Sequence, residues 1–160
     1  MQPLLADVAS YGFQAQLVEG EQRKNPLVFG RLGHDKRKPT VTMYGHYDVF
    51  ATHATQWSHD PFTVLAKNGF LYGRGVSDDK GPLLAMLFAC VDLMNGGQEL
   101  PVNVAFVVEG EEECRSAGLR KAVEQNIGWF EDTDVVLFSN STWLGTTTVC
   151  AHVYAVMLLV

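Results

Sequence analysis

Three short motifs contain acidic side chains, one of them with an imidazole, at spacings that could bind metal. Residues 45–49 read GHYDV, residues 77–81 read SDDKG, and residues 109–113 read EGEEE. Three adjacent carboxylates repel one another, and divalent cations held nearby would neutralise that repulsion. Carboxylates and imidazole are also the ligands that suit zinc, or a manganese- or cobalt-like ion. The motifs therefore indicate a candidate site for divalent metal.

Each motif alone also has an ordinary structural explanation. A histidine such as His46 after a strand is usually a polar residue whose hydrogen bonds are satisfied. Asp78 could cap the N-terminus of the helix that follows it. The three consecutive glutamates at 111–113, called the glutamate run below, could begin a solvated helix, because the helix dipole favours negative charge there. The position of the motifs in the fold has to separate these alternatives.

The elements that must position the motifs follow from the apolar pattern. Short apolar runs bounded by turn residues predict strands, apolar residues at helical spacing predict helices, and Asn68-Gly69 predicts a two-residue hairpin turn. The predicted strands are residues 13–19, 25–33, 41–45, 102–108 and 134–139, the hairpin is 62–73, and the helices are 80–94 and 116–125. This order predicts an α/β domain with a mainly parallel sheet flanked by helices.

The motifs fall where the predicted strands end. His46 and Asp48 follow one strand, the glutamate run follows another, and Asn140 follows a third. Asp78 and Asp79 come directly before a helix. In open α/β sheets, ligands bind beyond the carboxyl ends of the strands. We therefore expect four segments to bring oxygen and nitrogen ligands to one edge of the sheet.

The composition limits the class of protein. A length of 160 residues suits one domain, and a formal net charge of −6 argues against nucleic acid or an anionic membrane as a partner. Three cysteines without a paired spacing are typical of a reducing compartment. No signal-peptide pattern is visible, nor any run of roughly 18 apolar residues. We expect a cytoplasmic protein.

Five motifs occur in the order found in one enzyme family: GHYDV, WSHDPF, LYGRGVSDDKGP, VVEGEEE and FSNSTWLG. In these motifs the chain resembles the zinc aminopeptidase, carboxypeptidase and aminoacylase family, and most of all its branch of cytosolic non-specific, carnosinase-like dipeptidases. The resemblance implies a metal-dependent hydrolase that cleaves small peptides with metal-activated water. It also implies that residues 1–160 are the N-terminal portion of a di-zinc exopeptidase catalytic domain. The lid and dimerisation domain and the C-terminal catalytic portion would be absent, so we expect this chain to be inactive alone.

The resemblance assigns metal ligands by position. His46 would bind one ion, Asp78 would bridge both ions, and Glu113 would bind the second. The expected cofactor is a pair of divalent ions, zinc in the first place and manganese as the alternative.

The resemblance also assigns two catalytic residues. Asp48 would hydrogen-bond the ring of His46 and fix its tautomer. Glu112 would be the general base that accepts a proton from the bridging water and passes it to the leaving amine. Glu111 has no assigned role and is expected to be solvated.

Three features depart from the family pattern. Asn140 stands where the family has an acidic zinc ligand, and a neutral amide oxygen binds zinc poorly compared with carboxylate. Arg115 occupies a position usually given to glycine. The segment after residue 145 lacks the arginine-glycine run expected in this branch.

The asparagine at position 140 leaves two alternatives for function and partners. The first is a dipeptidase that acts on small peptides and could form a homodimer through the missing lid domain. The second is a catalytically impaired subunit, because the Asn140 pattern resembles the peptidase-like subunit of the fungal glutathione-degrading complex. That subunit works with a glutamine-amidotransferase-like partner.

Overall fold

A five-stranded mixed sheet forms the centre of the structure, a computed structural model that describes residue 6 and residues 8–140. Strands β3, β6 and β7 are parallel, whereas β2 is antiparallel to β6 and β1 is antiparallel to β2. The α/β class is confirmed, with the antiparallel strands confined to one side of the sheet. The spatial order is β1 (Gln14–Val18), β2 (Leu27–Leu32), β6 (Asn103–Glu109), β3 (Thr40–His46) and β7 (Thr133–Phe138).

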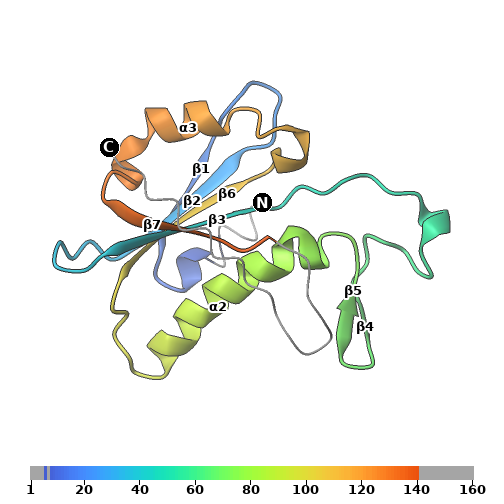
Figure 1. Ribbon diagram of the computed structural model, residues 1–160, viewed down its shortest axis with the longest axis horizontal. Helices are drawn as coiled ribbons and strands as arrows, with labels where there is room; N and C mark the ends of the chain where they lie inside the picture. The colour runs from blue at the N-terminus through green and yellow to red at the C-terminus, as the bar shows by residue number, and fades with distance from the viewer. Residues whose placement is uncertain (1–5, 7, 141–160) are drawn as a thin grey trace.

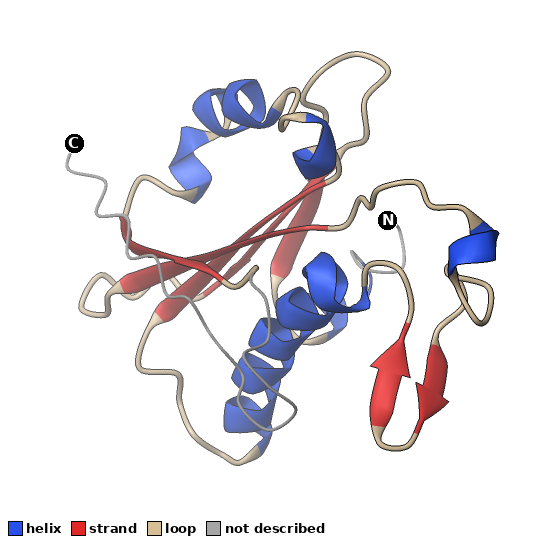
Figure 2. Cartoon of the chain, turned by 45° about the vertical axis from the view of Figure 1, so that its right-hand side comes forward, coloured by secondary structure: helices blue, strands red, loops and turns tan. Residues whose placement is uncertain are grey.

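Helices cover both faces of the sheet (Figure 1, Figure 2). Helix α2 (Gly81–Asn95) lies on one face. Helix α3 (Leu119–Gln125) and the short helix η4 (Ile127–Trp129) lie on the other face. The sheet is therefore the middle of three layers, and its strands β6 and β3 are buried between them.

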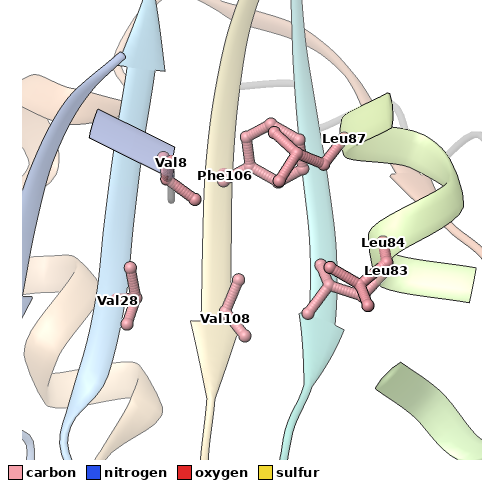
Figure 3. A pocket seen from close by; sticks show the side chains of 7 residues that line it. All are labelled: Val8, Val28, Leu83, Leu84, Leu87, Phe106 and Val108. Carbon is pink, nitrogen blue, oxygen red and sulfur yellow. The ribbon is translucent and has the colours of Figure 1, made fainter. Parts of the chain in front are cut away.

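The core under α2 fixes the first turn of that helix against the sheet. Leu83 and Leu87 of α2 face Phe106 and Val108 of β6, with Val28 of β2 beside them (Figure 3). Burying a large apolar side chain stabilises the fold by roughly 1.5–3 kcal/mol. This packing also holds the segment before α2 close to the end of the sheet.

The face under α3 has a separate apolar core. Phe29 of β2 meets Phe130 edge to face, with ring centroids 4.9 Å apart and an interplanar angle of 85°. Ala105 and Val107 of β6 and Ala122 of α3 are buried in the same cluster. This core fixes α3 and the loop before it, which begins with the glutamate run.

A hairpin projects from the three layers near the start of α2 (Figure 1). It consists of β4 (Leu65–Lys67) and β5 (Phe70–Tyr72), and it follows the short helix η1 (Ala54–Gln56). The predicted turn is confirmed, because Asn68 and Gly69 have positive φ angles of 53° and 80°.

The predicted start of the second helix at Ser116 is wrong. Ser116 and Gly118 have left-handed φ angles of 52° and 90°, so the helix begins only at Leu119. Gly118 also leaves no room for a side chain, since a Cβ would lie 2.6 Å from the backbone nitrogen of Glu21.

No helix among residue 6 and residues 8–140 is both long and apolar enough to cross a membrane. The WLG motif, the segment after residue 145 and Cys150 lie outside the described residues.

Candidate active site

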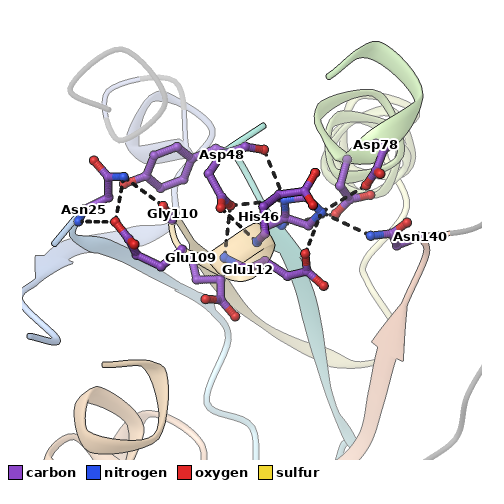
Figure 4. Close-up of polar contacts among 12 residues, drawn as sticks. Asn25, His46, Asp48, Asp78, Glu109, Gly110, Glu112 and Asn140 are labelled. Atoms are coloured by element: carbon purple, nitrogen blue, oxygen red, sulfur yellow. Dashed lines mark hydrogen bonds and ion pairs between the residues drawn. The ribbon is translucent and has the colours of Figure 1, made fainter. Parts of the chain in front are cut away.

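The parallel pairing of β3 with β6 brings two of the predicted motifs to the same edge. His46, the last residue of β3, is directly opposite Glu109, the last residue of β6. The backbone N–H of Tyr47 donates to the carbonyl of Glu109 at 2.9 Å and extends the pairing by one residue. Asp48 and the glutamate run therefore leave the sheet side by side (Figure 4).

His46 is the centre of the site and is fully buried, with 0% of its surface exposed. Its Nδ1 lies 3.2 Å from both the carbonyl oxygen and Oδ1 of Asp48. Its Nε2 lies 3.1 Å from Oδ1 of Asp78 and 3.8 Å from Oε2 of Glu112. The amide Nδ2 of Asn140 lies 3.1 Å from the same Nε2. Side chains from four segments thus converge on one imidazole ring (Figure 4).

Asp48 joins the histidine to the glutamate run. Besides the contact with His46, its carboxylate accepts the backbone N–H of Glu112 at 3.2 Å and that of Glu113 at 3.0 Å. The predicted contact between Asp48 and the ring is present, and the contact with the glutamate backbone is an addition that the motif did not reveal.

Asp78 and Asp79 lie in η2 (Val76–Lys80), a π-helical segment that runs directly into α2 and is kinked at Asp78, whose backbone is non-helical (φ −137°, ψ 94°). Asp78 does not cap either helix, so that alternative is wrong; its side chain is 54% exposed and faces His46. The Asp78–Asp79 peptide bond is cis.

Asp79 is a buried acid that the sequence left without a role. Its Oδ2 accepts the backbone N–H of His46 at 3.1 Å, while its buried Oδ1 has no hydrogen-bond partner among the described residues. Burial raises the pKa of the Asp79 carboxyl to about 7. Gly45 permits this contact, because a Cβ there would lie 2.7 Å from Oδ2 of Asp79.

The electrostatics of the site reflect crowded negative charge. Burial opposes protonation of His46, but the carboxylates around it, Glu112 first, outweigh burial and raise its pKa. Burial and then the charges of Asp78 and Glu112 raise the pKa of Glu113. Bound cations would relieve this repulsion.

Glu109, the first residue of the EGEEE motif, is a second buried acid to which the sequence assigned no role. It is 1% exposed, and the hydroxyl of Tyr44 donates to its Oε1 at 2.5 Å. Burial raises the pKa of Glu109. The alternation along β6 contained the signal: Ala105 and Val107 face the α3 core, so Glu109 must face the same side.

Glu111 contradicts the expectation of a solvated side chain. It is only 8% exposed, and its carboxylate binds Lys24 and Asn25. No local pattern could reveal this, because these partners lie 87 and 86 residues away in the sequence.

The donor set fits a divalent metal in its chemistry. One imidazole nitrogen faces carboxylate oxygens from two segments, which is the mixture of nitrogen and oxygen ligands that zinc and manganese bind. Among residue 6 and residues 8–140, however, no three His, Cys, Asp or Glu side chains are grouped as a finished metal site. The neutral side-chain amide of Asn140 also lies on the Nε2 side of the ring, at 3.1 Å.

Residues 42–152 match the sequence profile of Peptidase family M20/M25/M40. The chain belongs to this peptidase family. His46, Asp48, Asp78 and Glu112, which the structure brings together, all lie within the matched residues.

Relatives of this M20/M25/M40 family member are peptidases. It is 43% identical over 126 residues to the Cys-Gly metallodipeptidase DUG1 of Candida albicans, covering 76% of this chain and 26% of the relative. It is 42% identical over 140 residues to the probable di- and tripeptidase DUG2 of Saccharomyces cerevisiae, covering 80% of this chain and 16% of that one.

A solved structure agrees with the fold of this family member. Human carnosine dipeptidase 1 superposes with a TM-score of 0.83 at 33% sequence identity, over 90% of this chain and 32% of the human chain. The chain thus spans about a third or less of the length of these relatives.

Proposed function

We propose that this chain carries the N-terminal catalytic residues of a metal-dependent hydrolase that cleaves small peptides. One observation supports this most strongly: the His46 ring lies between Asp48 on Nδ1 and the carboxylates of Asp78 and Glu112 on Nε2. A histidine that served stability alone would not be surrounded by three acids, because the repulsion between the three carboxylates destabilises the fold.

Three side chains would hold two divalent ions: His46 one ion, Glu113 the other, and Asp78 both. A bound ion of this kind acidifies water and polarises a carbonyl group. Zinc is proposed first and manganese second, since both accept nitrogen and oxygen ligands.

The chain's own side chains would then direct the proton transfers. Asp48 holds a proton on Nδ1 of His46 and leaves Nε2 free to bind. Glu112, on the Nε2 side of the ring, would accept a proton from the attacking water and deliver it to the leaving amine.

The names of the relatives support dipeptides as the substrate class. We further propose that additional protein completes the catalytic domain, because the relatives are three or more times longer than the matched part. A lid domain that dimerises would belong to that remainder, and the composition supports a cytoplasmic location.

Replacing Glu112 tests the proposed base. Glu112→Gln in the full-length protein, supplied with zinc or manganese, should lower kcat for dipeptides at least about a hundredfold, because the amide cannot accept the proton. Metal content, measured by elemental analysis, should stay the same. Glu19→Gln, which removes an equal charge from an exposed position, is the control. Equal turnover in Glu112→Gln and wild type would contradict the assignment.

A second function is a catalytically impaired subunit that acts through a partner protein, such as a glutamine-amidotransferase-like chain. The neutral Asn140 against Nε2 of His46 favours it, because the ion at His46 would then have Asp78 but no second carboxylate as a ligand.

Metal binding separates the two functions. Two ions per full-length chain support the hydrolase, whereas no metal together with a stable partner supports the subunit. Asn140→Asp should raise metal affinity by at least about tenfold, since it adds a charged ligand. Isothermal titration with zinc measures this, and unchanged affinity would contradict a metal position beside Asn140.

A further inference from the structure

The glutamate run is attached to the protein on two sides. On one side Asp48 accepts the backbone N–H groups of Glu112 and Glu113. On the other side Glu111 binds the loop that precedes β2. Its Oε1 accepts the backbone N–H of Asn25 at 3.0 Å and the side-chain amide of Asn25 at 2.9 Å. Its Oε2 accepts Nζ of Lys24 at 3.0 Å.

We propose that Glu111, anchored by Lys24 and Asn25, is a positioning residue that sets the place of Glu112 and Glu113. This inference rests on the proposed function, in which Glu112 is the base and Glu113 a metal ligand. The Lys24–Asn25–Glu111 contacts are called the glutamate anchor below.

The chemistry of Glu111 differs from that of its neighbours in the run. Both carboxylate oxygens of Glu111 accept hydrogen bonds, from Asn25 and from Lys24, whereas Oε2 of Glu112 lies 3.8 Å from Nε2 of His46. Lys24 offsets the charge of Glu111 directly. The run therefore contains one acid that is already paired, Glu111, and one that faces the ring of His46, Glu112.

The anchor leaves little freedom for the run to move. The side-chain amide of Asn25 also donates to the carbonyl of Gly110 at 2.9 Å. A Cβ on Gly110 would lie 2.2 Å from Cζ of Tyr47 and 2.7 Å from Cβ of Asn25, so the backbone fits tightly between them. The hydroxyl of Tyr47 in turn donates to the carbonyl of Pro26 at 2.7 Å.

The backbone after Glu111 depends on the same anchor. The carbonyl of Glu111 accepts the N–H of Cys114 at 3.0 Å and that of Ser116 at 2.8 Å. Glu112 and Glu113 lie inside this turn. A shift of Glu111 would therefore displace both carboxylates and carry that of Glu112 away from His46. A displacement of about 1 Å can cost two orders of magnitude in rate.

Kinetics of the full-length protein with zinc test the effect on the reaction. Glu111→Ala should lower kcat for dipeptides about tenfold while KM changes less than about twofold, because the base is misplaced and the substrate contacts remain. Glu111→Gln should stay within about threefold of wild type, since its amide oxygen still accepts from Asn25. Glu19→Gln is the control for loss of charge.

Hydrogen exchange of the metal-free protein tests the geometry without any activity. The amides of residues 112–116 should exchange at least about tenfold faster in Glu111→Ala than in wild type. Asn25→Ala, which keeps its backbone N–H, should give a smaller increase and serves if Glu111→Ala does not fold. Glu19→Gln should leave the exchange rates unchanged.

The outcomes separate this inference from the proposed function. If the wild-type protein were inactive but only the anchor variants showed fast exchange, the proposed hydrolase function would be refuted. The attachment of the glutamate run through Glu111 would still be supported. Unchanged exchange in Glu111→Ala would overturn the anchor. Faster exchange with unchanged kcat would overturn the positioning role, and so would a lower melting temperature as the only effect.

Discussion

The two ends of the parallel strands differ in whether their buried polar groups have hydrogen-bond partners. At the amino end, Asn103 is 2% exposed and its amide is fully used: Oδ1 accepts the N–H of Asp35, and Nδ2 donates to the carbonyls of Asp35 and Lys38. At the carboxyl end, Oδ1 of the buried Asp79 has no hydrogen-bond partner within residues 8–140, and acids crowd around His46.

Arg31 shows the same completeness at the amino end. It is 4% exposed, and its guanidinium donates to both carboxylate oxygens of Asp132 and to the carbonyls of Trp129 and Gly33. The amino end thus stabilises the fold. The carboxyl end keeps unpaired polar atoms and like charges, which are typical of functional sites.

The largest change in the free energy of unfolding is expected when the hydrogen bonds of Arg31 at the amino end are removed. Arg31→Met should lower the free energy of unfolding by about 2–3 kcal/mol, because it removes the hydrogen bonds of a buried guanidinium, two of them to the carboxylate of Asp132. Arg37→Met is the matched control, since the Arg37 side chain is 88% exposed in its pair with Asp35 and should contribute less than about 1 kcal/mol. Urea unfolding measures both. A loss of under 1 kcal/mol for Arg31→Met would remove the contrast between the two ends.

The next effect concerns the unpaired acid at the carboxyl end. The folded pKa of Asp79 is raised from 3.8 to about 7, so the folded state binds the proton more tightly than the unfolded state. The stability that Asp79 contributes is therefore present at low pH and decreases as the pH rises from about 4 to 7.

Asp79→Asn should raise the free energy of unfolding of the metal-free protein by about 2 kcal/mol at pH 8 and make no difference near pH 4. Urea unfolding with chelator at both pH values measures this. Asp92→Asn, at an exposed position of α2, should show no such dependence. If Asp79→Asn were no more stable than wild type at pH 8, the negative charge of the buried Asp79 would have to be stabilised by other groups.

The smallest change in stability is expected at Arg115, which follows the glutamate run at the edge of the site. Arg115 has a left-handed φ of 71°, at the position where the resemblance leads us to expect glycine. Arg115→Gly should stabilise the protein by about 1 kcal/mol, because glycine adopts this conformation without strain. The same change in helix α3, Arg120→Gly, should destabilise it by about 1 kcal/mol. Thermal unfolding compares the two signs, and destabilisation by Arg115→Gly would indicate that the Arg115 side chain makes a favourable contact.

Local patterns predicted the elements well and their junctions poorly. The strands, the hairpin turn and α2 follow from apolar spacing and from Asn68-Gly69, because these signals lie within a few residues. The predicted start of α3 at Ser116 was wrong, because Ser116 has a left-handed conformation in the loop that follows the glutamate run. The metal-binding roles of His46, Asp78 and Glu113 stay predictions.

The sequence by itself determined which acids and which histidine reach the edge of the sheet, because chain order and strand ends place them there. Only the tertiary structure decided what each acid does. Glu111 is paired with a loop 86 residues away, Asp79 is buried against the backbone of His46, and Asp78 is left partly exposed. Neighbouring carboxylates look alike in sequence, and their charge and position depend on partners and burial that only the folded chain supplies.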